Sequence, residues 1–203
     1  LHSSLDRLRA AGANISEVAR PNLDFEHYHQ VYLLLLRAAT GTILSDSEFQ
    51  DHLEGARLRS VGDHSYRAYI ERGVSLHYRQ WWHLHNEREK FRIEWKRFFS
   101  DYDILLCPVA ASTAFPHDHV GDRPDRTIPI NGNPEAVVDQ LFWAGITTLA
   151  RLPSSVIPVG MAADNLPCGL QIITDYLEDY TALEFAGLAE QTLGGFMPPS
   201  GFH

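Results

Sequence analysis

The sequence is poor in the features that mark several protein classes. It has only two cysteines in 203 residues, so Cys107 and Cys168 are expected to be reduced thiols rather than a disulfide framework. It has only two lysines, Lys90 and Lys96, and a formal net charge of −9, which argues against binding a nucleic-acid backbone. Its longest apolar run, 31–36, is far shorter than the ~20 residues of a membrane-spanning helix.

Other absences concern the start of the chain and its linkers. No positive region followed by an apolar one opens the sequence, so we predict no signal peptide and a cytoplasmic location. The chain begins Leu1-His2-Ser3 without a methionine, which predicts a truncated or processed start. There is no internal repeat and no Gly/Ser tract. Hydrophobic residues make up 44% and charged residues 21%, as in a globular protein with one sizeable core.

Helical patterns dominate the first half of the chain. A short helix is predicted near the start, with Leu5 and Leu8 on one face and Gly12 at its end. Residues 14–19 alternate like a short strand. Three further helices are expected, at 24–40, 45–59 and 75–99. The run 31–36 is apolar on most sides, so the helix that contains it should be buried.

Strand patterns appear in the second half. Residues 103–107 form a continuous apolar run ending at Pro108, which is typical of a strand covered on both faces. A long polar loop is expected up to 133. The run Asn133-Pro134-Glu135 then predicts a helix start, with proline at the first helical position, and the helix should reach 150.

The last part of the chain reads as a hairpin and a helix. Two strands, 155–160 and 169–174, are separated by a short turn and should pair with each other. A closing helix is expected at 181–193. The whole pattern predicts an α/β fold, with 1–100 mainly helical and 101–203 containing the strands.

No self-contained active site is visible among the possible nucleophiles. The chain has no Gly-x-Ser-x-Gly turn and no glycine-rich phosphate loop. Ser154 and Ser155 read as strand-entry residues. Cys107 ends an apolar strand and Cys168 follows a proline, so both favour a structural role. We therefore predict no catalytic residue from residue chemistry.

Eleven histidines raise the question of a metal site. His83 and His85 lie two apart in a predicted helix, where they point to different faces. His117 and His119 flank Asp118 in a loop and could chelate, but this set is small for a metal centre. We predict no metal and no other cofactor.

Three segments resemble strands of the amidase signature family. Residues 102–108, Tyr-Asp-Ile-Leu-Leu-Cys-Pro, resemble its Tyr-Asp-x-Leu-Leu-x-Pro strand. Residues 152–160 resemble its Pro-x-x-x-x-Pro-x-Gly strand, and 165–173 its Gly-Leu-Pro-x-Gly-Leu-Gln-Ile-Ile return. They occur in the family's order, before a closing helix with Glu190. Arg72-Gly73 and the opening 5–18 also fit, so the resemblance covers nearly the whole chain.

The sequence also departs from the family's pattern. Thr148 and Arg151 stand where the family usually carries Asn and Gly, and Asn165 stands where Gly is usual. The family's catalytic Lys, cis-peptide Ser and nucleophilic Ser belong to an N-terminal half with a Gly/Ser-rich signature that does not occur here. Lys90 and Lys96 lie on a charged helical face, so neither matches a buried catalytic lysine.

The resemblance implies a C-terminal portion of an amidase, as a single unit 1–203 with a mixed β-sheet covered by helices. The parent would cleave a carboxamide C–N bond through an acyl-serine, and this chain alone would be inactive. The resemblance places part of the substrate pocket on two short segments: Pro108, Val109 and Ala110, and Phe142 and Trp143.

The expected partners are an N-terminal catalytic half, on the same or a separate chain, and a small-molecule amide, and a homo-oligomer with a second copy stays open. Nucleic acid and membrane are not expected partners. Two other interpretations stay open: a non-catalytic binding or scaffold protein derived from an amidase, and the non-catalytic chain of a split amidase.

Overall fold

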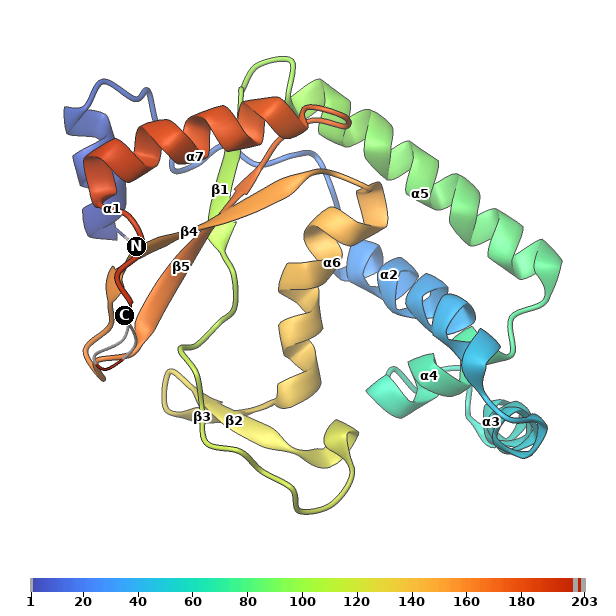
Figure 1. The fold of residues 1–203 in the computed structure, drawn as a ribbon. Coiled ribbons are helices and arrows are strands. Elements are labelled where there is room, and N and C mark those ends of the chain that lie inside the picture. The colour runs from blue at the N-terminus through green and yellow to red at the C-terminus, as the bar shows by residue number, and fades with distance from the viewer. Residues whose placement is uncertain (1, 199–200, 202–203) are drawn as a thin grey trace. The chain divides into compact units, whose positions relative to one another are not determined.

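The computed structural model describes residues 2–198 and 201 and divides into two compact units. The first contains Leu1–Pro21, Trp95–His117 and Arg151–His203, and the second contains Asn22–Glu94 and Asp118–Ala150. The long helix α5, Tyr78–Phe98, runs from the second unit into the first (Figure 1). Helices and strands together confirm the predicted α/β class.

The first unit is built on a three-stranded antiparallel sheet in the order β1-β5-β4. The strands are β1 Leu105–Pro108, β4 Ser154–Met161 and β5 Pro167–Ile173. β4 and β5 pair from Ser154 opposite Ile173 to Met161 opposite Pro167, which confirms the predicted hairpin. β1 was expected to be covered on both faces, but it is half-buried along its length and is an edge strand.

Two helices, α1 His2–Ala10 and α7 Asp179–Leu193, pack with the sheet in the first unit (Figure 1). Leu170 and Ile172 of β5 lie two residues apart and therefore share a face. They form a core with Leu8 of α1 and with Ala182 and Ala189 of α7. This core holds the sheet against the closing helix. The bounds of α7 confirm the helix predicted at 181–193.

The ends of the two helices are tied together. Arg7 of α1 donates to the backbone carbonyl of Leu193 at 3.2 Å and to that of Thr192. These are carbonyls of the last turn of α7, which have no partner inside the helix. Gly12 follows α1 with φ +101, the left-handed geometry that glycine supplies at a helix end.

The second unit is mainly helical, with α2 Phe25–Thr40, α3 Asp46–Leu58, α4 Tyr66–Val74 and α6 Leu141–Ala150. The Asp24 carboxylate accepts from the backbone N–H groups of Glu26 and His27 and caps α2. Ser45 and Glu48 form a reciprocal capping box at α3. The helices predicted at 24–40 and 45–59 are confirmed.

Helix α2 is the centre of the second unit, as its apolar run predicts. Val31, Leu33 and Leu35 are all buried. The hydroxyl of Tyr28 donates to the carbonyl of Ile146 at 2.7 Å, which joins α2 to α6 away from solvent. A buried tyrosine hydroxyl with a partner is stabilising, whereas an unpaired one is costly.

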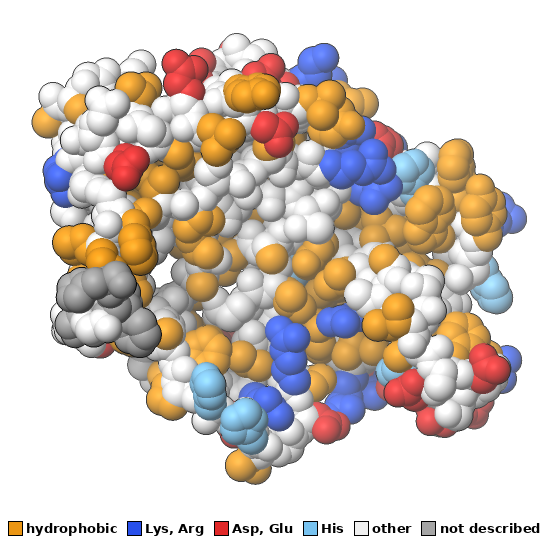
Figure 2. All heavy atoms as spheres, viewed as in Figure 1, with side chains coloured by type: hydrophobic (Ala, Val, Ile, Leu, Met, Phe, Trp, Pro, Cys, Tyr) orange, Lys and Arg blue, Asp and Glu red, His pale blue; other side chains and the backbone are white. Residues whose placement is uncertain are grey.

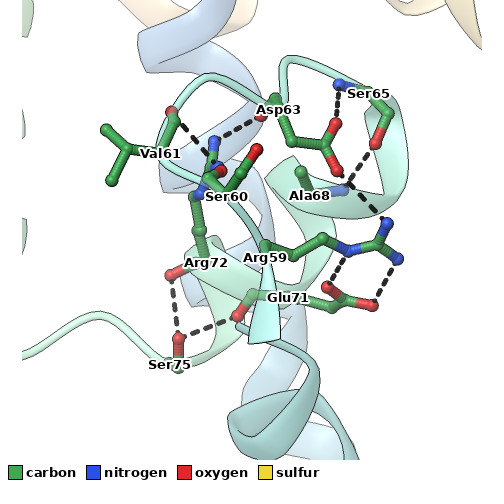
Figure 3. Close-up of polar contacts among 9 residues, drawn as sticks. All are labelled: Arg59, Ser60, Val61, Asp63, Ser65, Ala68, Glu71, Arg72 and Ser75. Carbon is green, nitrogen blue, oxygen red and sulfur yellow. Dashed lines mark hydrogen bonds and ion pairs between the residues drawn. The ribbon is translucent and has the colours of Figure 1, made fainter. Parts of the chain in front are cut away.

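A polar network closes the loop between α3 and α4 (Figure 3). Arg59 donates to both carboxylate oxygens of Glu71, at 2.7 and 3.0 Å. Arg72 donates to the backbone carbonyls of Asp63, at 2.7 Å, and Ser60, at 2.6 Å. Two parallel hydrogen bonds between a guanidinium and a carboxylate fix the orientation of both groups in addition to the attraction of their charges. The network therefore holds the loop 59–65 in one conformation.

We expect Glu71→Gln to lower the thermal midpoint at pH 7 by a few degrees, with an effect that depends on pH. The hydrogen bonds from Arg59 lower the pKa of Glu71. A lowered carboxyl pKa adds stability above the usual value of 4.5, and this stability is lost as pH falls through the folded-state pKa. Wild type and variant should therefore converge in acid when melted in parallel. A constant difference across pH would contradict the ion pair.

Three sequence predictions about local structure are wrong or incomplete. Residues 14–19 form no strand, because none of the described strands pairs with them. Helix α4, Tyr66–Val74, was not predicted. The helix expected from Asn133 begins instead at Leu141.

Asn133 lies in a second, two-stranded sheet. β2 Thr127–Ile130 and β3 Asn133–Ala136 pair antiparallel. Asn131 and Gly132 connect them with φ of 51° and 84°, and positive φ at both positions is the geometry of a type I′ hairpin turn. The short helix η3 Val137–Gln140 then leads into α6. Part of the predicted polar loop is therefore regular structure, including η2 Arg123–Asp125.

Among the residues that the structure describes, no helix is both long and apolar enough to cross a membrane.

Candidate functional site

Three of the predicted pocket residues lie where β1 ends. Pro108 is the last residue of β1 and stands opposite Leu170 of β5. Val109 and Ala110 follow in an exposed loop. Gly169 of β5 makes room for this loop, since a Cβ built on it would lie 3.1 Å from Cγ2 of Val109. The valine side chain therefore rests against the backbone of the central strand.

A second contact holds the same loop. The hydroxyl of Thr113 donates to the Asp164 carboxylate at 2.6 Å, and the other oxygen of Asp164 accepts from the N–H of Leu166 at 3.2 Å. The bond from Thr113 lowers the pKa of Asp164, so the carboxylate stays charged at neutral pH. The β4–β5 turn thus anchors the loop that follows β1.

The other two predicted pocket residues belong to the second unit. Phe142 and Trp143 lie in the first turn of α6, and their rings meet edge to face at 5.4 Å between centroids. Phe142 also packs edge to face on Phe25 and on His29 of α2. Burial lowers the pKa of His29, which favours a neutral imidazole beside these rings. In this unit, Phe142 packs in the aromatic contact between α2 and α6.

The candidate nucleophiles and bases do not form a catalytic group. Burial raises the pKa of Cys107 to about 12, so its thiol is protonated and unreactive at neutral pH. Ser154 and Ser155 lie in β4, where their backbones pair with β5. Lys90 is exposed and pairs with Glu87 at 2.6 Å, and Lys96 is also exposed. A lysine base needs burial that neither position provides.

Within residues 2–198 and 201, no group of three or more His, Cys, Asp or Glu side chains is placed to hold a metal ion.

Comparison with known sequences identifies the family. The family model described as Amidase matches residues 1–183. The chain is 27% identical over 205 residues to a glutamyl-tRNA(Gln) amidotransferase subunit of Rubrobacter xylanophilus, covering 92% of this chain and 40% of that protein. It is 25% identical to the corresponding protein of Maricaulis maris, over 96% of this chain and 40% of the relative.

Solved structures share the fold. A bacterial aryl acylamidase of the amidase signature family superposes with a TM-score of 0.68 at 17% identity, covering 95% of this chain and 39% of that chain. The glutamyl-tRNA(Gln) amidotransferase subunit of Thermotoga maritima gives 0.66 at 21% identity, covering 100% and 41%.

The α/β fold, the three strands and the family match together place the chain in the fold class of the amidases. The protein belongs to the amidase signature family, as its three strand motifs predicted. It spans about two fifths of the length of the relatives it matches, 40% for each of the first two.

Arg151 occupies a backbone position that suits glycine, which the resemblance led us to expect there. Its φ is 59°, and a left-handed residue with a Cβ costs roughly 1–2 kcal/mol. We expect Arg151→Gly to be more stable than Arg151→Ala by about 0.5–1 kcal/mol, because both variants lose the arginine side chain and the greater freedom of unfolded glycine offsets part of the backbone gain. Asn165→Gly is the matched control, since Asn165 has φ 60° but asparagine tolerates it. A lower melting temperature for Arg151→Gly than for Arg151→Ala would contradict this.

Proposed function

We propose that this chain is the C-terminal part of an amidase-signature hydrolase that cleaves a carboxamide C–N bond through an acyl-serine. In this proposal, 1–203 acts as a single C-terminal portion. It supplies sheet strands and part of the substrate pocket, while the nucleophile lies in an N-terminal catalytic half.

The observation that carries the proposal is the sheet itself. The three family motifs fold into β1, β4 and β5, and β1 and β4 both form outer edges of the three-stranded sheet. An edge strand presents unpaired backbone N–H and C=O groups along its length. Such edges suit a sheet that strands of another segment extend, as the proposed catalytic half would.

In the first unit, the proposed contribution to the pocket is the loop after β1. Pro108 lacks an N–H and has a fixed φ, so it gives the loop a rigid start. The contacts of Val109 with Gly169 and of Thr113 with Asp164 hold the loop beyond it. A pocket loop that is already ordered before the substrate binds lowers the entropic cost of binding. For the second unit, taken by itself, the proposal assigns Phe142 and Trp143 to aromatic contact with the acyl part of the amide.

In the proposed reaction, the serine hydroxyl of the catalytic half attacks the carboxamide carbon. The C–N bond then breaks, the nitrogen leaves with a proton, and water hydrolyses the resulting ester. The proposal assigns the transfer of those protons to the catalytic half and to no group within residues 2–198 and 201. Its role is to orient the acyl part of the amide and to exclude water.

A cytoplasmic location is part of the proposal. Cys107 and Cys168 are both free thiols, which suits a reducing compartment. The relatives are named as amidotransferase subunits, so transfer of the amide nitrogen to an acceptor, with further subunits, is the second candidate.

The test is to isolate the protein from its own source and label it with a fluorophosphonate serine probe. We expect the label on the same polypeptide, with a denatured mass well above 22.9 kDa, or on a second polypeptide that co-purifies with it. A protein of 22.9 kDa with no labelled polypeptide bound to it would contradict the proposal and favour a binding or scaffold protein.

A further inference from the structure

The negative charge of the protein is concentrated at one end of the sequence. Residues 152–203 contain no lysine and no arginine. They contain six acidic residues: Asp164, Asp175, Glu178, Asp179, Glu184 and Glu190. Most of these acids lie on or just before α7. All charged side chains of this helix are therefore acidic.

Helix α7 has apolar residues on two faces. Its inner face packs Ala182, Ala189 and Leu193 into the core of the first unit. Its outer face carries Tyr180 at 87% exposure and Leu183 at 59%. These two share a face with Gly187, because residues three, four and seven apart line up along a helix. Figure 2 shows hydrophobic and acidic side chains interleaved over α7, at the top of the view.

Gly187 points independently to a partner on this outer stripe, defined here as Tyr180, Leu183, Glu184, Gly187 and Leu188. A glycine inside a helix costs about 1 kcal/mol relative to alanine. Nothing inside the described structure requires it, since a Cβ built on Gly187 meets no atom within 4 Å. A missing side chain on an outer face lets a second helix approach closely, because interaxial distance depends on the side chains at the contact.

We propose that the outer stripe of α7 is a docking site for a basic amphipathic helix of another polypeptide. Leucines of the partner would pack on Leu183 and Leu188 over Gly187, and its arginines or lysines would pair with Glu184 and its acidic neighbours. Opposite charges at the rim of an interface speed association and fix the register.

Charge argues against the other occupants. A two-fold contact between α7 helices of two copies would be centred on Gly187 and would bring Glu184 near Glu190 of the other copy. Like charges across an interface are disfavoured. Nucleic acid and anionic lipid would meet the same repulsion. The inference does not depend on amide hydrolysis, so a binding measurement tests it alone.

The probe is a fluorescent synthetic helical peptide with leucine and alanine on one face and arginine on its flanks. We expect it to bind the 203-residue chain with a Kd of about 1–100 μM and more weakly as salt increases. Gly187→Gln should raise the melting temperature, because glutamine is a good helix former, and weaken binding about tenfold. Glu184→Lys should also weaken binding about tenfold.

Asp51→Lys is the matched control, since it makes the same change of charge at an exposed position of α3. It should bind within about twofold of wild type. Equal weakening by Asp51→Lys would show attraction to the net charge only and overturn the proposal. Equal binding by all variants would show that the peptide binds away from the outer stripe and would also overturn it. No binding by wild type would also overturn it. A dimer of the wild-type chain that Gly187→Gln abolishes would assign the stripe to a second copy instead.

Discussion

Replacing Gly73 with alanine is expected to destabilise the protein by about 1–3 kcal/mol. A Cβ at this position would lie 2.5 Å from Cβ of Arg37 and 2.9 Å from the carbonyl oxygen of Leu34. Both atoms belong to the backbone region of α2 and have little freedom to move. Helix α4 must then shift away from α2, and the cost outweighs the helix propensity gained from alanine.

The measurement is thermal unfolding, where each kcal/mol moves the midpoint by roughly 2–4 °C in a chain of this size. Gly187→Ala is the matched control, because it makes the same change in a helix with open space around it. The free energy of unfolding of that variant should rise by up to about 1 kcal/mol. If Gly73→Ala melted at or above the wild-type temperature, the close packing of α2 on α4 would be refuted.

Ile172→Ala is expected to have the largest effect of the substitutions considered, about 2–5 kcal/mol. Ile172 is fully buried, at 0% exposure, on the central strand of the sheet. Its side chain belongs to the core that joins the sheet to α1 and α7. Truncation removes apolar burial and leaves a cavity that both helices and the sheet would have to close.

Val156→Ala serves as the control on the neighbouring strand. Val156 pairs opposite Gln171 and is 55% exposed. Truncating its side chain should therefore lower the free energy of unfolding by less than about 1 kcal/mol. Denaturant unfolding of both variants gives the comparison. A cost for Ile172→Ala as small as that for Val156→Ala would contradict the core described for the first unit.

Two elements could be predicted from the sequence because capping or turn residues mark their ends. Ser45 and Glu48 specify the start of α3 by themselves, and the reciprocal bonds are present. The β4–β5 hairpin is likewise marked by a short polar turn between two apolar runs. In both cases the signal is local, so no knowledge of distant contacts is needed.

The errors have physical causes. Asn131-Gly132 is a strong hairpin signal, but Asn133-Pro134 also fits a helix start, and the helix interpretation was the wrong one. Helix α4 lacks a long periodic pattern and depends on packing of Gly73 against α2. Residues 14–19 alternate like a strand but have no partner among the described strands, which periodicity alone cannot reveal.

The candidate site shows the same limit. Pro108 could be placed at the end of a strand because the apolar run stops there. The hydrogen bond from Thr113 to Asp164 joins residues 51 apart in sequence, so no local sequence pattern predicts it. From the sequence, only a short turn between the two strands was predicted at this place. The fold supplies its second role as the anchor of the loop after β1.

The central proposal is that this chain is part of an amidase whose catalytic groups lie outside residues 2–198 and 201. The most direct test is ammonia or amine release from a set of small carboxamides by the pure 203-residue chain. We predict no release above the buffer rate, because neither lysine is buried and the thiol of Cys107 is protonated. Release that a serine-directed inhibitor abolishes would contradict the claim and require a nucleophile within this sequence.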